Sequence, residues 1–142
     1  MLMIPETQDV LYKIGLASLG ATQHELEQLA AAYWYTFEVG LCQDTDGSRK
    51  LLGGALLTSI EESNLAMSPK AKIIDFDIET VTKGDLSQSI QYSGLQKIYV
   101  MSPEIHELCD QLDKWVDHNF LQKREYSCTF CEKTRSIIVN HK

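Results

Sequence analysis

The stretch from Thr22 to Cys42 constrains the fold of this 142-residue chain more than any other. It opens with TQHE, the pattern of a capping box, in which the Thr22 side chain accepts from the backbone N–H of Glu25 and the Glu25 side chain reaches back. Apolar residues then recur three and four positions apart, as on one face of a helix: Leu26, Leu29, Tyr33, Phe37 and Leu41. The sequence therefore predicts a helix near residues 22–42, with Glu25 exposed at its start.

A second helix is predicted near residues 103–119, within SPEIHELCDQLDKWVDHNF. Ser102 is expected to cap this helix and Pro103 to occupy its first turn, where a missing backbone N–H costs nothing. Its apolar face is formed by Ile105, Leu108, Leu112, Trp115 and Val116. We therefore expect Trp115 to belong to the core or to an interface.

The remaining elements are predicted to be short. Residues 51–59 favour a strand or a close-packed turn, because they are apolar and contain a glycine pair. We further expect a short helix at 60–68, a loop at 82–94, a strand at 96–101 and, from YSCTFCEKTRSIIVN, a hairpin near 126–139. The predicted fold class is a single domain, mainly α with a few short strands.

The charge and the hydropathy of the chain exclude several kinds of partner. Lys and Arg number 13 against 20 Asp and Glu, a net charge of −7, so the basic face that binds nucleic acid is not expected. No tract is long and apolar enough to cross a membrane. The N-terminal MLMIPETQDV lacks a basic region followed by an apolar core, so we expect no export signal and a cytoplasmic location.

The cysteines agree with that expectation. Cys42, Cys109, Cys128 and Cys131 follow no spacing typical of secreted disulfide frameworks, so they are predicted to be reduced. Cys128 and Cys131, in CTFC, have the spacing of half a zinc site. A structural zinc needs four ligands and the chain has no second pair at a matching spacing, so ordinary turn cysteines are the preferred interpretation.

Glu38 is the single acid within the aromatic and aliphatic run AAYWYTFEVGLCQ. On a helix, Trp34 and Cys42 lie on the same side as this carboxylate. An unpaired buried charge costs several kcal/mol, so Glu38 must find a cationic or hydrogen-bonding partner or become neutral. Two interpretations stay open from the residues alone: a structural partner, such as Arg, Lys or backbone amides, or a metal ion in a pocket walled by Tyr33 and Trp34.

Three blocks of the sequence resemble consecutive segments of the pterin-dependent aromatic amino acid hydroxylases, the family of the phenylalanine, tyrosine and tryptophan hydroxylases. They are IGLASLGA (14–21), YWYTFEVGLC (33–42) and GGALLTS (53–59), in the order and with the spacing of that family. Weaker similarity continues through IYVMSPE and KTRSIIV. The resemblance covers nearly all of residues 1–142 and implies the C-terminal half of the family's catalytic domain, ending in a short hairpin.

The resemblance implies iron chemistry. The family holds a non-haem Fe(II) with two histidines and one glutamate, an arrangement that leaves coordination positions free for O₂. Glu38 matches the carboxylate ligand, and Tyr33 matches a catalytic tyrosine near the iron. The family's histidine pair, in a His-x4-His arrangement, lies upstream of IGLASLGA. No such pair occurs in this chain, whose histidines are expected to lie at the surface: His24, His106, His118 and His141.

The resemblance also implies a substrate pocket. Trp34 matches the aromatic residue against which the substrate ring packs. Thr58 and Ser59 match a pair of hydroxyl residues, one supporting an iron-ligating histidine and the other facing the substrate. Val39 stands where the family usually has Phe, so one wall of the pocket is smaller here. The pterin-stacking segment and the arginine for the substrate carboxylate lie upstream, so no cofactor-binding residue is assigned.

The function implied is a monooxygenation, in which tetrahydrobiopterin and O₂ react at Fe(II) and the ring of an aromatic L-amino acid is hydroxylated. Trp34 resembles the phenylalanine and tyrosine hydroxylases, which favours phenylalanine as substrate. The segments SIEES and AMSPKAK resemble the tryptophan hydroxylases more, which makes tryptophan the second candidate. This chain alone is expected to bind neither iron nor pterin and to be inactive. It also lacks the family's terminal helix, so a dimer through the hairpin or the Glu38 face is expected in place of a tetramer. The alternative is a non-catalytic truncated paralogue, or an incomplete gene product, acting as an association domain.

Overall fold

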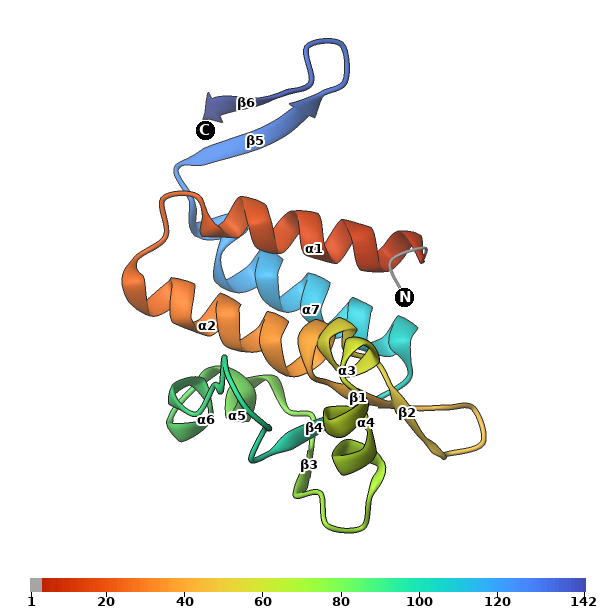
Figure 1. The fold of residues 1–142 in the computed structure, drawn as a ribbon. Coiled ribbons are helices and arrows are strands. Elements are labelled where there is room, and N and C mark those ends of the chain that lie inside the picture. Colours follow the sequence, from red (N-terminus) through yellow and green to blue (C-terminus); the bar gives the residue numbers. More distant parts are fainter. Residues whose placement is uncertain (1–3) are drawn as a thin grey trace.

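Three helices form one layer of the molecule (Figure 1). The structure is a computed structural model that describes residues 4–142 and, within them, every side chain except that of Gln88. The layer consists of α1 (Pro5–Ser18), α2 (Gln23–Tyr33) and α7 (Ile105–Asn119). The helix α2 begins as predicted: Thr22 accepts from the Glu25 backbone N–H at 3.3 Å, and the Glu25 carboxylate accepts from the Thr22 N–H at 2.8 Å. The mainly α fold class is confirmed.

The second layer combines short helices with a small sheet. The sheet has the order β2-β1-β4-β3, in which β1 pairs antiparallel with β2 and parallel with β4, and β3 pairs parallel with β4. The strands are β1 (Leu41–Gln43), β2 (Arg49–Leu51), β3 (Ile73–Asp75) and β4 (Tyr99–Ser102). The helices are α3 (Gly54–Thr58), α4 (Ile60–Met67), α5 (Ile78–Thr82) and α6 (Asp85–Gln88).

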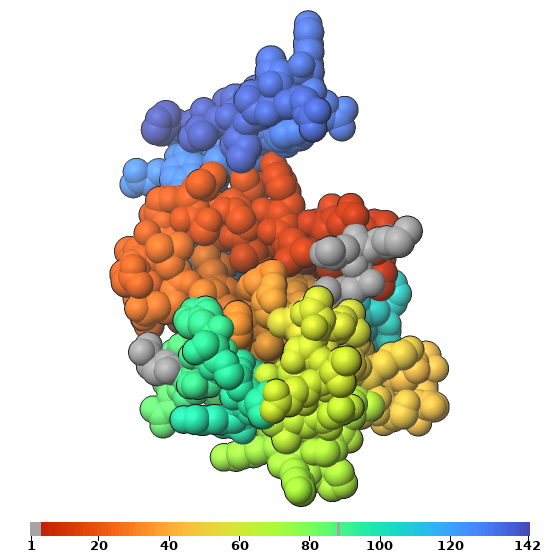
Figure 2. Space-filling view, in the orientation of Figure 1, coloured from red at the N-terminus to blue at the C-terminus, as the bar shows by residue number. Residues whose placement is uncertain are grey.

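A terminal hairpin projects from the helical layer, and Figure 2 shows it standing apart from the body. A 3₁₀ turn, η2 (Leu121–Lys123), leads from α7 into β5 (Tyr126–Cys131), which pairs antiparallel with β6 (Ser136–His141). The hairpin predicted near 126–139 is thus confirmed, with a slightly longer second strand. Its base is tied to the body by Arg124, whose guanidinium donates to the Glu25 carboxylate at 3.0 Å and to the Ala17 carbonyl at 2.9 Å.

Two apolar cores meet at the end of α2. The first lies among α1, α2 and α7 and includes Val10, Leu29, Leu108, Leu112 and the predicted Trp115. The second lies among α2, the short helices and β4 and includes Leu56, Ala66, Val81, Tyr99 and Val100. The segment after α2 contributes to both, because Phe37 is buried in the first core whereas Tyr35 and Val39 are buried in the second.

Two glycines bring the chain into close contact where these cores meet. The backbone N–H groups of Leu52 and Gly53 both donate to the Gly40 carbonyl, at 3.1 and 2.9 Å. A Cβ added at Gly40 would lie 2.3 Å from the Thr36 carbonyl oxygen, and one at Gly53 would lie 2.1 Å from the Glu38 carbonyl oxygen. The close-packed turn predicted from the glycine pair is therefore present at Gly53.

Some predicted boundaries are wrong. The helix predicted over 22–42 ends at Glu38, because Leu41–Gln43 pairs with two neighbouring strands as β1. Residues 54–58 are helical as α3, so a strand is wrong for that part of 51–59. Ser102 does not cap α7: it ends β4, paired with Cys42, and Glu104 caps the helix by accepting from the His106 N–H at 3.2 Å.

Other elements were not predicted from the sequence. The helix α1 and the strand β3 fall in stretches with no prediction, and α6 forms inside the expected loop 82–94 around the buried Leu86. Glu25 is not exposed as expected, because it is paired with Arg124 and its side chain is 25% exposed. The absence of an export signal was predicted partly from residues 1–3, which lie outside the described residues. Over residues 4–142, no helix has the length and apolarity that a membrane span requires.

The close approach at Gly53 makes a prediction about stability. We expect Gly53→Ala to lower the free energy of unfolding by about 3 kcal/mol, because the new methyl group meets backbone that cannot move independently. Gly54→Ala is the matched control, since its Cβ would lie 3.8 Å from the nearest atom, the Phe37 carbonyl oxygen. Urea unfolding followed by circular dichroism measures both variants, and equal losses would contradict the steric explanation.

Candidate functional site

The helix carrying Glu38 changes geometry just before that residue. Residues Trp34–Glu38 form a π-helical turn, η1, in which the Val39 N–H donates to the Trp34 carbonyl at 2.9 Å. The Thr36 hydroxyl donates to the Ala32 carbonyl at 2.6 Å. A π turn inserts an extra residue into the helix and shifts the following side chains around its axis, and such turns are frequent at functional sites. The apolar periodicity of residues 22–42 did not predict this change in helix geometry.

Glu38 is paired with a neutral donor and not with a cation. The Tyr33 hydroxyl donates a short hydrogen bond to Glu38 Oε1, and both side chains are half-buried. This hydrogen bond, together with burial and the nearby negative charge, raises the pKa of Tyr33 from 10.0 to about 12. The expectation that Glu38 pairs with a neighbouring hydrogen-bond donor is therefore met by Tyr33.

A cavity of about 190 Å³ lies beside this turn and brings together three of the predicted substrate residues. Trp34, Val39 and Ser59 all line it. The Trp34 indole N–H donates to the Gln96 side-chain oxygen at 3.2 Å, and its ring meets the Tyr92 ring edge-on with centroids 5.0 Å apart. The cavity thus has an aromatic wall in a fixed orientation, as a site for a flat ring requires.

Three other predicted residues do not line this cavity. Thr58 is exposed, and its hydroxyl donates back to the Ala55 carbonyl within α3 at 3.0 Å. Tyr33 and Glu38 form their own pair on the same turn. The Tyr33–Glu38 pair and the aromatic cavity are therefore two distinct features of the structure. The η1 turn contributes Glu38 to the pair and Trp34 to the cavity.

Sequence reasoning missed the other six residues that line the cavity: Ala55, Glu62, Gln91, Tyr92, Gly94 and Gln96. Glu62 stands in the first turn of α4, where an acid is expected simply because it favours a helix N-terminus. Tyr92 and Gln96 belong to the stretch between α6 and β4, which is polar and has no periodicity. Only the contacts made in the folded chain identify these residues as cavity residues.

The described residues supply a single candidate ligand for an iron ion. Across residues 4–142, no three His, Cys, Asp or Glu side chains are grouped closely enough to hold a metal. All four histidines are exposed, as predicted. Cys128 and Cys131 are free and lie three residues apart on β5, so they point to opposite faces of the hairpin and form no half zinc site. Glu38 as an iron ligand therefore stays a prediction, and residues 4–142 do not by themselves supply the further ligands that it would need.

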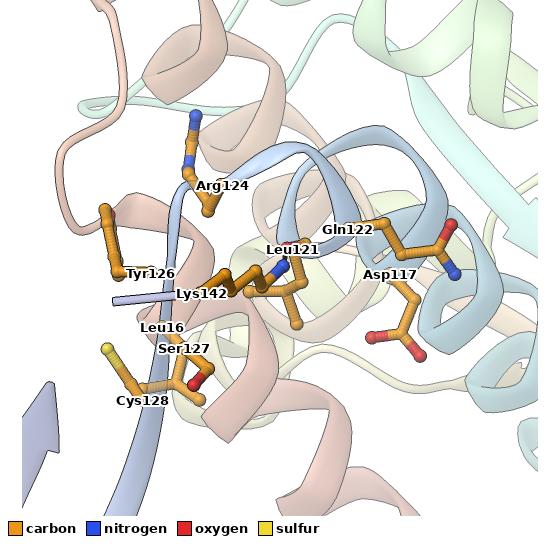
Figure 3. Close-up of a pocket in the computed structure, with 9 residues that line it drawn as sticks. All are labelled: Leu16, Asp117, Leu121, Gln122, Arg124, Tyr126, Ser127, Cys128 and Lys142. Atoms are coloured by element: carbon orange, nitrogen blue, oxygen red, sulfur yellow. Dashed lines mark hydrogen bonds between the residues drawn. The ribbon is translucent and has the colours of Figure 1, made fainter. Parts of the chain in front are cut away.

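A larger cavity, about 320 Å³, lies at the base of the hairpin and contains none of the predicted site residues (Figure 3). Lys142 crosses it and donates to the Leu121 carbonyl at 2.9 Å. Arg124 points away from the other lining side chains, toward its partners Glu25 and Ala17. These contacts attach the hairpin to α1, α2 and η2, so we regard this cavity as a structural junction.

The comparisons with known proteins agree on one family. The model described as biopterin-dependent aromatic amino acid hydroxylase matches residues 1–142. A phenylalanine-4-hydroxylase of Caenorhabditis elegans is 37% identical over 105 residues, 72% of this chain and 21% of that protein. A tyrosine 3-monooxygenase of Rattus norvegicus is 33% identical over 126 residues, 89% of this chain and 24% of that protein.

A solved structure adds the fold. The phenylalanine hydroxylase of Chromobacterium violaceum with bound oxidised Fe(III) has a TM-score of 0.70 and 26% sequence identity, and the match covers 85% of this chain and 43% of that one. The chain therefore spans less than half the length of this structure and about a quarter or less of the two relatives.

The Tyr33–Glu38 pair makes a prediction about ionisation. We expect Glu38→Gln to lower the pKa of Tyr33 from about 12 toward 10.0, because the charge that opposes tyrosinate formation is removed. Since the folded-state pKa is raised, this stabilisation is complete below about pH 10 and is lost as the pH rises through about 12. Tyrosinate absorbance against pH, with Tyr33→Phe identifying the transition and exposed Glu61→Gln as control, measures the shift. An unchanged Tyr33 transition would argue against the pair.

Proposed function

Because this chain belongs to the biopterin-dependent aromatic amino acid hydroxylases, we propose that it forms the carboxylate-bearing half of a pterin-dependent monooxygenase site. The observation that carries the proposal is the η1 turn, which carries both Glu38 and Trp34, the aromatic wall of the cavity. The family match over residues 1–142 and the similarity to an Fe(III)-bound phenylalanine hydroxylase support it.

In this proposal Glu38 is an iron ligand and Tyr33 positions it. A carboxylate that binds a metal needs its orientation fixed by a further hydrogen bond, and the Tyr33 hydroxyl supplies that bond at Oε1. When bound, iron with tetrahydrobiopterin and O₂ supplies the oxidising chemistry of the ring hydroxylation. Two further ligands are required, and the proposal assigns them to a histidine pair outside residues 1–142.

The substrate proposed is an aromatic L-amino acid whose ring packs on Trp34. The Gln96 side chain holds the indole of Trp34, and Tyr92 packs against it edge-on, so the wall is fixed before the ligand binds. Val39 and Ser59 form further parts of the cavity surface. Phenylalanine is the favoured substrate, because Trp34 resembles the phenylalanine and tyrosine hydroxylases, and tryptophan is the runner-up.

Iron binding distinguishes the proposal that Glu38 is an iron ligand from the alternative that Glu38 has only a structural role. We expect residues 1–142 alone to bind negligible iron and to be inactive, because one carboxylate cannot hold Fe(II) against water. In a longer chain that adds the upstream His-x4-His pair, Glu38→Gln should abolish iron binding and pterin-dependent turnover of phenylalanine or tryptophan. Metal analysis and turnover assays measure both.

A matched control for this experiment comes from α2 itself. Glu27 hydrogen-bonds only to the Gln23 side chain, at 3.2 Å, so Glu27→Gln should leave iron content and turnover unchanged. Glu25 is unsuitable because it is paired with Arg124. Stoichiometric iron in the short chain would mean that another residue of this chain completes the site. A longer enzyme indifferent to Glu38→Gln would return Glu38 to a structural role.

The hairpin supports the second candidate function, association. Cross-strand pairing places Cys128 opposite Val139 and Phe130 opposite Ile137, so these four side chains share one face. Phe130, Ile137 and Val139 are each about half exposed, at 51%, 47% and 55%. An isolated two-stranded hairpin is marginally stable and an exposed apolar face attracts a partner. We propose that two copies of the chain associate through this face.

Two adjacent isoleucines of nearly equal exposure allow a test of association through the hairpin face. Ile137 lies on the apolar face and is 47% exposed, whereas Ile138 lies on the opposite face, beside Thr129, and is 45% exposed. We expect Ile137→Lys to weaken dimerisation by at least about tenfold and Ile138→Lys to have little effect, because only the first places a charge in the interface. Sedimentation velocity over a range of concentrations measures both. A wild-type chain that stays monomeric at high concentration would refute the dimer.

A further inference from the structure

Glu62 is a buried carboxylate that forms no ion pair with any described residue. Only 7% of its surface is exposed, and it lines the aromatic cavity beside Trp34. Its Oε1 atom accepts two hydrogen bonds, one from the Tyr99 hydroxyl and one from the Gln96 backbone N–H at 3.0 Å. Burial and the hydrogen bond to Glu62 raise the pKa of Tyr99, which keeps its hydroxyl a donor. One oxygen of the carboxylate is thus fixed in place by two neutral donors.

The other oxygen, Oε2, is free to bind a ligand. This atom makes no hydrogen bond to any described residue. Among the described side chains, the polar atoms that are both fully enclosed and without a hydrogen-bond partner are Ser102 Oγ and Arg124 Nε, and Glu62 Oε2 is not one of them. Glu62 Oε2 therefore keeps contact with solvent. Glu62 also lines the cavity beside Trp34, so we infer that Oε2 faces this cavity.

Gln96 couples this carboxylate to the aromatic wall. Its backbone N–H holds Glu62, its side-chain oxygen accepts from the Trp34 indole, and its side-chain nitrogen donates to the Gln91 carbonyl at 2.7 Å. Gln96 therefore contacts both the Glu62 carboxylate and the Trp34 indole, and together with Tyr99 and Tyr92 it fixes one relative to the other. A rigid acceptor near a flat aromatic surface is suited to a ligand with a ring and a hydrogen-bond donor.

The negative charge of the cavity indicates which kind of hydrogen-bond donor a ligand should carry. Among the described side chains no Lys, Arg or His lines it, so the negative charge of Glu62 is uncompensated there. A buried anion is stabilised most by a cation that also donates hydrogen bonds. We propose that Glu62 Oε2 binds the ammonium group of an arylalkyl ammonium ligand whose ring packs on Trp34. This inference rests on the proposed function, in which that ammonium is the α-amino group of the aromatic amino acid.

Two ligands of matched shape test the proposal on the 142-residue chain. Phenethylamine carries a ring, two methylenes and an ammonium, whereas 3-phenylpropionate carries the same ring and methylenes with a carboxylate. We expect phenethylamine to bind at least about tenfold more tightly, because only it offers a cation to Glu62. Fluorescence of Trp34, with calorimetry as a second readout, measures both affinities; the other tryptophan, Trp115, lies in the helical core.

Substituting Glu62 tests whether its carboxylate causes the preference for phenethylamine. Glu62→Gln should remove at least about tenfold of the affinity for phenethylamine and leave 3-phenylpropionate unweakened. Glu61→Gln, one residue earlier on α4 and exposed, changes the net charge equally and should leave both affinities unchanged. Circular dichroism shows whether each variant folds, and the comparison of the two ligands on the wild-type chain needs no variant.

The outcomes separate this inference from the proposed function. Equal binding of the two ligands, or a preference that survives in folded Glu62→Gln, would overturn the role of Glu62 while leaving Trp34 as a ring-binding wall. If neither ligand binds, the cavity is not an ammonium site and the inference falls. The iron site at Glu38 is judged by metal binding in the longer chain, so its success or failure is independent of all these results.

Discussion

The contact between Gly40 and the Leu52–Gly53 backbone determines where every candidate functional group lies. Two N–H groups converge on the single Gly40 carbonyl, and neither Gly40 nor Gly53 has room for a Cβ. Because the chain closes on itself here, the segment that begins α3 is held against the carbonyl of Glu38. The helices α3 and α4, and with them Ser59 and Glu62, are thereby brought to the same side of η1 as Trp34. Without this contact the cavity would lose the part of its wall that Ala55, Ser59 and Glu62 form.

The π turn also determines where the candidate functional side chains lie. Tyr33 and Glu38 are five residues apart, and a regular α-helix with 3.6 residues per turn would point their side chains in different directions. The π turn brings these two side chains together, so that the Tyr33 hydroxyl can donate to Glu38. The inserted residue shifts the following side chains, and the Thr36 hydroxyl compensates by donating to the Ala32 carbonyl. The turn thus connects the packing of the two layers to the position of the carboxylate.

The sequence predicted the features that depend on short-range chemistry. The capping box of α2, the apolar face of α7 and the terminal hairpin follow from hydrogen-bonding patterns and periodicity that a few residues define. Predictions were wrong or absent where tertiary contacts decide, as at Ser102, whose backbone is committed to β4 by its pairing with Cys42.

The candidate site divides in the same way. Trp34, Val39 and Ser59 were named from the resemblance and do line one cavity. Glu62 and Gln96 were missed because their roles depend on residues 34 and 37 positions away in the chain, which no local pattern records.

Three glutamates of this chain differ in whether a hydrogen-bonding partner cancels their negative charge or leaves it able to bind a ligand. Glu25 is paired with Arg124, which neutralises it, and the pair ties the hairpin to the helical layer. Glu38 and Glu62 are each held at one oxygen by a tyrosine hydroxyl, Tyr33 and Tyr99. A tyrosine fixes the direction of a carboxylate but leaves its negative charge uncancelled. Such a carboxylate remains able to bind a cation, which is the property that both the iron proposal for Glu38 and the ammonium proposal for Glu62 require.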